Sequence, residues 1–278
     1  MRATGITGLL GRPYVDLEPH LDLSALPAIH DEVCLGLTQI PVDYTGGSHR
    51  SMGIAPPSRA HEVGVDYGEV IRGLDDDAFA TLASLADEPW TIDRAARESL
   101  EFGEERAVPL SRRQMLWLER RHKVYFPWKV FVELMASRSW ADRSDPEGKA
   151  FTRRARAFFP QTVAFVERLP FASIGRVIVL GLAPHDHGTV HRDGEPDQAP
   201  GHFITLCPAG DKRLFLWDEA EQSATPVTGR AYWFNDHDYH GVDADPFFRY
   251  SIRVDGVFEP SFLEALERAA PREAGAPR

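Results

Sequence analysis

The sequence has little cysteine, no excess of positive charge and no long apolar run. Cys34 and Cys207 are the two cysteines in 278 residues, which excludes a disulfide framework and favours a reducing cytoplasm. The net charge of −11 argues against nucleic-acid binding through a basic surface. The first residues lack the pattern of a signal peptide, and no apolar stretch is long enough to span a bilayer. We therefore expect a cytoplasmic globular protein without a nucleic-acid or membrane partner.

The first half of the chain reads as mainly helical. Acidic and hydroxyl residues predict helix starts at Asp75 and Ser111. Apolar residues alternate through 33–40, which predicts a strand there, and residues 128–135 read as a helix. A broad apolar stripe predicts a longer helix over 149–169, divided by Pro160.

The second half reads as a series of short strands with turn residues between them, followed by a last helix over 261–269. Strands are expected at 177–180, 202–206, 213–217, 231–234 and 248–258. This order predicts an α+β fold in which a barrel or jelly roll carries helices on one side. We divide the chain into an N-terminal region, 1–145, a core, 146–270, and a flexible tail, 271–278.

One short motif organises the chemistry. His191 and Asp193 are two residues apart, so on an extended strand both side chains point to the same face. His240 follows about fifty residues later and supplies a second imidazole. Two histidines and one carboxylate form the facial triad of non-haem Fe(II) oxygenases, which leaves the other coordination positions open. Three nearby histidines, His185, His187 and His237, are alternative ligands.

An arginine and a hydroxyl follow the distal histidine. Arg249 comes nine residues after His240, and Ser251 lies on the same strand face. A guanidinium and a hydroxyl suit a carboxylate bound in a pocket. Arg253 lies on that face too and is the rival for the role of Arg249.

With these residues in view, about the last 120 residues resemble the Fe(II)/2-oxoglutarate-dependent oxygenases, and within them the aspartyl/asparaginyl β-hydroxylases and cis-proline hydroxylases. Pro184 stands seven positions before His191, and His202 stands eleven after it, as in that group. The resemblance extends to the segments 159–162, 167–170, 229–240 and 254–260. Two positions depart from some members: Asp193 supplies the carboxylate that some aspartyl hydroxylases lack, and Pro200 replaces an arginine.

The resemblance implies a fold, a cofactor and a reaction. The core would be a cupin-like double-stranded β-helix, or jelly roll. His191, Asp193 and His240 would bind Fe(II), Arg249 would pair with the distal carboxylate of 2-oxoglutarate, and Ser251 and His202 would contact the co-substrate. The enzyme would use O2 to hydroxylate an amino acid, free, carrier-bound or in a peptide, and release succinate and CO2. The carboxylate at Asp193 favours hydroxylation over halogenation, and residues 1–145 would select the substrate.

Two other classes of protein remain as alternatives. A cupin-like metalloenzyme that does not use 2-oxoglutarate would have no need of Arg249. A non-catalytic β-barrel binding module would carry the triad residues by chance, and it would fail to bind iron.

Overall fold

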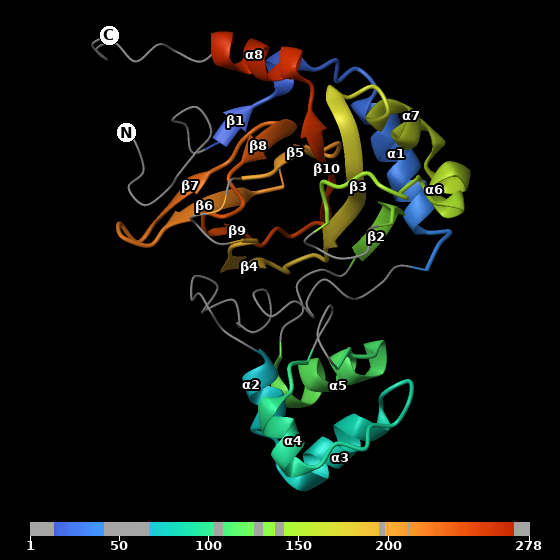
Figure 1. Cartoon of the computed structure of the whole chain (residues 1–278), viewed down its shortest axis with the longest axis vertical. Helices are drawn as coiled ribbons and strands as arrows, with labels where there is room; N and C mark the ends of the chain where they lie inside the picture. Colours follow the sequence, from blue (N-terminus) through green and yellow to red (C-terminus); the bar gives the residue numbers. More distant parts are fainter. Residues whose placement is uncertain are drawn as a thin grey trace.

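The computed structural model describes residues 14–41, 67–102, 108–124, 130–136, 142–194, 198, 200–210 and 212–269. Helices and antiparallel strands are both present, so the α+β class is confirmed. The strands form two sheets, with helices beside the larger sheet and a separate group of helices below them in Figure 1. The tail predicted at 271–278 lies outside the described residues.

The larger sheet has six strands in the order β1-β8-β5-β10-β3-β2, and each pair of neighbours is antiparallel. Their bounds are β1 (Tyr14–Asp16), β2 (Val130–Met135), β3 (Phe171–Leu182), β5 (His202–Leu206), β8 (Ala231–Phe234) and β10 (Arg249–Phe258). The longest pairing joins β3 and β10, and a register shift lies between Asp255 and Gly256. The N-terminal part of the chain thus contributes two strands, β1 and β2, to this sheet.

The smaller sheet has four antiparallel strands in the order β4-β9-β6-β7. Their bounds are β4 (Gly188–His191), β6 (Leu214–Asp218), β7 (Ser223–Pro226) and β9 (His240–Val242). Leu214, Leu216 and Val242 of this sheet share a buried core with Ile204, Ile252 and other residues of the larger sheet. Two sheets that bury a common apolar layer hold the strands β4 and β9 in fixed positions, which matters for the site below.

Helices cover the β3–β2 side of the larger sheet (Figure 1). They are α1 (Leu26–Leu37), α6 (Arg153–Phe158) and α7 (Pro160–Val166), while α8 (Pro260–Ala269) follows β10 and a 3-10 turn, η1 (Glu18–His20), follows β1. Glu32 of α1 accepts hydrogen bonds from the backbone N–H groups of Gln161 and Thr162, at 2.7 and 2.8 Å. A carboxylate at these otherwise unsatisfied donors fixes the start of α7 against α1.

The remaining helices have a core of their own. They are α2 (Tyr67–Arg72), α3 (Asp76–Ser84), α4 (Arg94–Ser99) and α5 (Arg112–His122). Asp75 caps α3, and Ser111 forms a capping box with Gln114 at the start of α5, so both predicted helix starts are confirmed. Phe79, Leu82 and other apolar residues pack together between these helices. Among the described residues, no helix has the length and apolar character needed to cross a bilayer.

Two predicted elements were wrong, and one division was right. The segment predicted as a strand at 33–40 belongs to helix α1 as far as Leu37, and the segment predicted as a helix at 128–135 is strand β2 from Val130 onward. The stripe over 149–169 divides into α6 and α7 at Phe159 and Pro160, as its proline indicates. The strands predicted at 202–206 and 231–234 are confirmed with the same bounds.

Candidate metal centre

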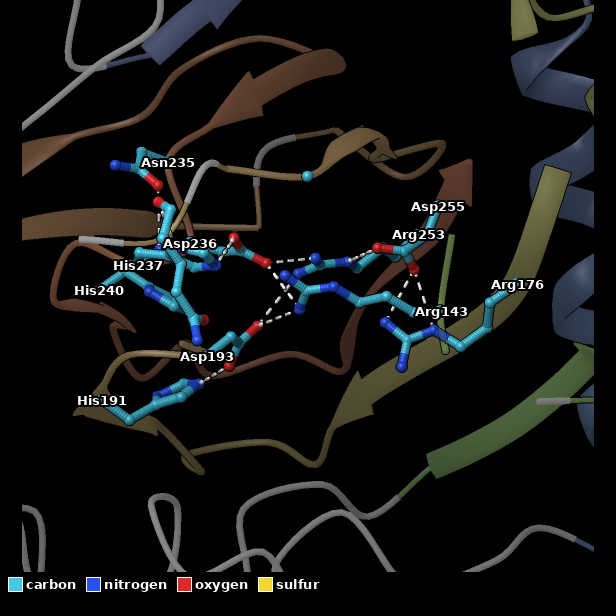
Figure 2. Close-up of polar contacts among 12 residues, drawn as sticks. Arg143, Arg176, His191, Asp193, Asn235, Asp236, His237, His240, Arg253 and Asp255 are labelled. Atoms are coloured by element: carbon cyan, nitrogen blue, oxygen red, sulfur yellow. Dashed lines mark hydrogen bonds and ion pairs between the residues drawn. The ribbon is translucent and has the colours of Figure 1, made fainter. Parts of the chain in front are cut away.

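His191, Asp193 and His240 come together at the edge where β4 meets β9 (Figure 2). One ligand atom from each residue lies within 4.8 Å of the other two. His191 and His240 are direct partners across the two strands, and their ring centroids are 4.3 Å apart. Nε2 of His191 lies 3.4 Å from Oδ1 of Asp193. Among the described residues, these three side chains are the group that could hold a metal ion.

The backbone fixes the tautomer of both imidazoles. Nδ1 of His191 lies 2.7 Å from the carbonyl oxygen of Thr189, and Nδ1 of His240 lies 2.9 Å from that of Asp238. A carbonyl can only accept, so Nδ1 of each ring donates and Nε2 keeps its lone pair. Hydrogen bonds of this kind orient the histidine ligands of metal sites.

The environment also favours the protonation states that bind a metal. Burial, with a smaller contribution from His191, lowers the pKa of His240 to about 4, so this imidazole is neutral at neutral pH. Burial alone would raise the pKa of Asp193, but the neighbouring His191, His240 and Arg253 hold it well below its ordinary value. The centre therefore offers a neutral imidazole and a carboxylate without losing a proton first.

The second oxygen of Asp193 faces two arginines. Oδ2 lies 3.2 Å from Nη1 of Arg253 and 3.9 Å from Nη1 of Arg143. Both arginines also pair with Oδ2 of Asp236, at 2.9 Å for Arg143. The backbone N–H of Asp193 donates to the carbonyl of Asp236 at 2.7 Å, so the two aspartates are held together by backbone and side chains.

A chain of buried ion pairs continues from this point along the inner face of β10. Nε of Arg253 donates to Oδ1 of Asp255 at 2.8 Å, and Arg176 donates to Oδ2 of the same carboxylate through Nε and Nη2, at 2.9 and 2.8 Å. The guanidinium of Arg253 also lies 3.9 Å from the ring centroid of Phe203. Burial opposes its charge, but the three aspartates raise the pKa of Arg253 above its ordinary value. Three arginines and three aspartates thus form one charge-balanced network (Figure 2).

A buried lysine, Lys212, lies just before β6 and next to Ser251 of β10. Nζ of Lys212 lies 2.7 Å from Oγ of Ser251 and 3.3 Å from the carbonyl oxygen of Leu180. Lys212 is 4% exposed and Ser251 is 2% exposed. Burial lowers the pKa of Lys212 to about 7. Ser251 was predicted as a co-substrate contact, whereas Lys212 was missed because a single lysine before an apolar run has no distinguishing sequence pattern.

Arg249 and His202 have other partners in the structure. Arg249 begins β10, and its Nη2 lies 3.2 Å from Oδ2 of Asp245. His202 begins β5, its Nδ1 accepts from the backbone N–H of Phe258 at 3.0 Å, and the two rings stack at 4.8 Å. The expected roles of Arg249 and His202 toward a co-substrate stay predictions.

The alternative histidines have other environments. Nδ1 of His237 lies 3.2 Å from the carbonyl oxygen of Gln198, and its ring fills the space beside Gly194, where an added Cβ would lie 2.5 Å from Nε2. His185 has a positive φ of 67° in the loop before β4, and His187 is buried in the same loop. Neither His237 nor these two residues joins the three-residue cluster found in the described part of the chain.

No family model matches, and no curated protein matches. Among solved structures, a prolyl-4-hydroxylase from Pseudomonas putida aligns at 11% identity and a TM-score of 0.26, covering 46% of this chain and 72% of that chain. A 2OG-Fe(II) oxygenase family oxidoreductase from Burkholderia pseudomallei aligns at 14% and 0.29, covering 45% and 66%.

A cupin 2 conserved barrel domain protein from Salinispora arenicola also aligns, at 12% identity and a TM-score of 0.21, covering 37% of this chain and 74% of that chain. Likenesses of this extent do not establish a function.

Proposed function

We propose that this chain is an Fe(II)- and 2-oxoglutarate-dependent oxygenase with a double-stranded β-helix core, and that it hydroxylates an amino acid, free or within a peptide. The cluster of His191, Asp193 and His240 carries the proposal, since its ligand atoms lie within 4.8 Å of one another. Two imidazoles and one carboxylate are the ligand set of non-haem Fe(II) oxygenases, which need open positions for co-substrate and O2.

The side chains of the cluster fit this metal. Both Nδ1 atoms donate to backbone carbonyls, which leaves Nε2 of His191 and His240 as ligand atoms. The low pKa of Asp193 keeps its carboxylate charged. A structural zinc site would close its coordination with a fourth protein ligand, whereas three ligands suit a metal that binds substrates.

The interior of the site suits a dicarboxylate co-substrate. Bound to Fe(II), 2-oxoglutarate and O2 supply the oxidant that hydroxylates a C–H bond, and succinate and CO2 are released. We infer that Lys212 and Ser251 receive the distal carboxylate, because the ammonium and the hydroxyl are buried 2.7 Å apart on the inner side of β10. Arg249, predicted for this role, is the second candidate, although Asp245 already pairs with it.

The substrate class rests on the resemblance of the sequence to the aspartyl/asparaginyl β-hydroxylases and cis-proline hydroxylases. We propose that the region 1–145 selects the substrate. The chemistry at Asp193 favours hydroxylation, since the carboxylate occupies a coordination position that a halide would need.

The test begins with the protein purified without oxygen. Fe(II) and 2-oxoglutarate are added, and the visible charge-transfer band of an iron-bound 2-keto acid is measured. We expect a band in the parent protein, none in His191→Ala, and a much weaker band in Lys212→Met than in Arg249→Ala at equal 2-oxoglutarate. Succinate release with candidate amino acids and peptides then identifies the substrate.

Each other outcome has a definite meaning. Iron binding without a band would favour a cupin-like metalloenzyme that does not use 2-oxoglutarate. A band that Arg249→Ala removes and Lys212→Met leaves intact would show that Arg249, and not Lys212, binds the distal carboxylate of 2-oxoglutarate. A parent protein that binds no iron would refute the metal centre and leave a non-catalytic binding module.

A further inference from the structure

A short loop outside the two sheets delivers Arg143 to the metal centre. The loop, residues 142–149, is tied to itself by Lys149, whose Nζ lies 2.6 Å from the carbonyl oxygen of Asp142 and 3.1 Å from its Oδ1. Backbone hydrogen bonds from Asp145 to Asp142 and from Lys149 to Pro146 close two turns within it. Such a self-braced loop holds its side chains in place without a regular element.

The loop is also seated closely on strand β3. A Cβ added at Gly175 would lie 2.4 Å from the carbonyl oxygen of Arg143 and 2.6 Å from the carbonyl carbon of Ser144. Backbone atoms at that distance leave no room for any other residue type at position 175. The backbone of Arg143 is thereby fixed against the sheet that carries Arg176 and Arg253.

From this loop the side chain of Arg143 extends inward and is 11% exposed. Its Nη1 lies 2.9 Å from Oδ2 of Asp236 and 3.9 Å from Oδ2 of Asp193 (Figure 2). Arg253 reaches the same two oxygens from β10. Two guanidinium groups from separate parts of the chain therefore meet at the carboxylate oxygen of Asp193 that does not face His191.

We propose that Arg143 is a positioning residue for the metal ligand Asp193, acting with Arg253 and Asp236. This inference rests on the proposed metal centre. Arg253 holds Oδ2 of Asp193 at 3.2 Å, and Arg143 holds the adjacent Asp236 at 2.9 Å and lies 3.9 Å from the same oxygen of Asp193. Oδ1 of Asp193, which lies 3.4 Å from Nε2 of His191, stays directed at the imidazoles. Asp236 balances the added positive charge, so the arginines orient the ligand while the network keeps its charge balance.

When Arg143 is replaced, the loss of its charge and the loss of its positioning of Asp193 should change the affinity for a divalent metal ion in opposite directions. Removing a positive charge beside Asp193 would strengthen its attraction for a divalent cation. Losing the guanidinium, whose Nη1 lies beside Oδ2 of both aspartates, would free the carboxylate of Asp193 to rotate and would weaken a bond that needs a defined geometry. We expect the second effect to dominate, because outer partners of metal ligands typically contribute about 10- to 100-fold to metal affinity.

The experiment titrates the metal-free full-length protein with Co(II) and follows the ligand-field spectrum, with neither 2-oxoglutarate nor substrate present. Arg143→Gln and Arg143→Lys are compared with the parent. We expect both to raise the Kd for Co(II) by about 10-fold or more and to alter the spectrum. Arg156→Gln is the matched control, because Arg156 is an exposed arginine that also pairs with a carboxylate, Glu167, at 3.7 Å.

A second variant perturbs the loop without touching the arginine. Gly175→Ala pushes the backbone of residues 143–145 away from β3, so it should weaken Co(II) binding in the same direction. Melting temperatures of the metal-free proteins separate a general loss of folding from a change at the site.

Three outcomes are informative. The positioning role is overturned if the parent protein binds Co(II) and both Arg143 variants bind it equally well or more tightly. Full recovery in Arg143→Lys also overturns it, since charge alone would then suffice. A parent that binds no Co(II) instead defeats the proposed metal centre on which this inference rests.

Discussion

Replacing Lys212 with methionine should stabilise the protein while removing co-substrate binding. The substitution keeps the length of the side chain and removes a buried ammonium group. Burial moves the pKa of Lys212 from its ordinary value of 10.5 to about 7, which corresponds to on the order of 5 kcal/mol at about 1.4 kcal/mol per pH unit. The unfolded chain binds this proton more tightly than the folded protein does.

The sign of the pH dependence follows from that difference. The folded state is penalised fully below about pH 7, and the penalty disappears as the pH rises to 10.5. In the variant, Ser251 and the Leu180 carbonyl lose a hydrogen-bonding partner, which costs about 1–3 kcal/mol. The variant should therefore be more stable than the parent by on the order of 3 kcal/mol at pH 6. This advantage should shrink by about 3 kcal/mol between pH 6 and pH 9.

Urea unfolding of the metal-free proteins at both pH values measures the difference, and other titrating groups cancel between the two proteins. Lys149→Met is the control, because the side chain of Lys149 is also buried but pairs with Asp142 at 3.1 Å, so its loss should destabilise the fold. A Lys212→Met protein that is less stable than the parent at pH 6, or a difference that does not change with pH, would refute this account of Lys212.

Two further predictions use the same structure. If the protonated form of Lys212 binds the co-substrate, the Kd of 2-oxoglutarate should be constant below about pH 7 and rise by up to about tenfold per pH unit above it. Calorimetry on the Fe(II) or Co(II) protein measures this Kd. A Kd that is independent of pH up to 9 would indicate that an arginine binds the carboxylate instead. Gly256→Ala should destabilise the protein by several kcal/mol, on the order of 3, because the added Cβ would lie 2.2 Å from the carbonyl oxygen of Ser173; a melting temperature equal to that of the parent would contradict this packing.

The parts of the fold that were predicted correctly have local signals. The strands over 202–206 and 231–234 are short β-branched and aromatic runs bounded by turn residues, and their bounds are confirmed. Ser111 and Asp75 predict the starts of their helices because a cap is a contact between residues three apart. The spacing of His191 and Asp193 was also a local signal, although β4 ends at His191 and Asp193 lies in the bend after it, where its backbone N–H donates to the carbonyl of Asp236.

The two wrong secondary-structure predictions have different causes: a sequence window that was too short at α1, and burial on both faces at β2. In α1, the buried residues Leu26, Ile29, Val33 and Gly36 follow the helical period, but a window beginning at residue 33 contains alternation without that longer pattern. Strand β2 is buried on both faces, since Phe131, Val132, Leu134 and Met135 are all inside. A short segment whose apolar residues fall on both faces cannot be distinguished from a helix by periodicity.

The arginine and lysine contacts were harder to predict because they depend on tertiary placement. The offset from His240 favours Arg249, yet the structure brings Arg253 to Asp193 and leaves Arg249 with Asp245. Arg143 precedes Asp193 by fifty residues, and it reaches Asp193 because the glycine at position 175 lets its loop lie against β3. The spacing of residues along a strand determines which face of the sheet a side chain occupies. The partner that it meets on that face depends on which loops pack against the sheet. The carboxylate of a candidate metal site can thus be found from its spacing along the sequence, whereas the groups that would orient it must be found in three dimensions.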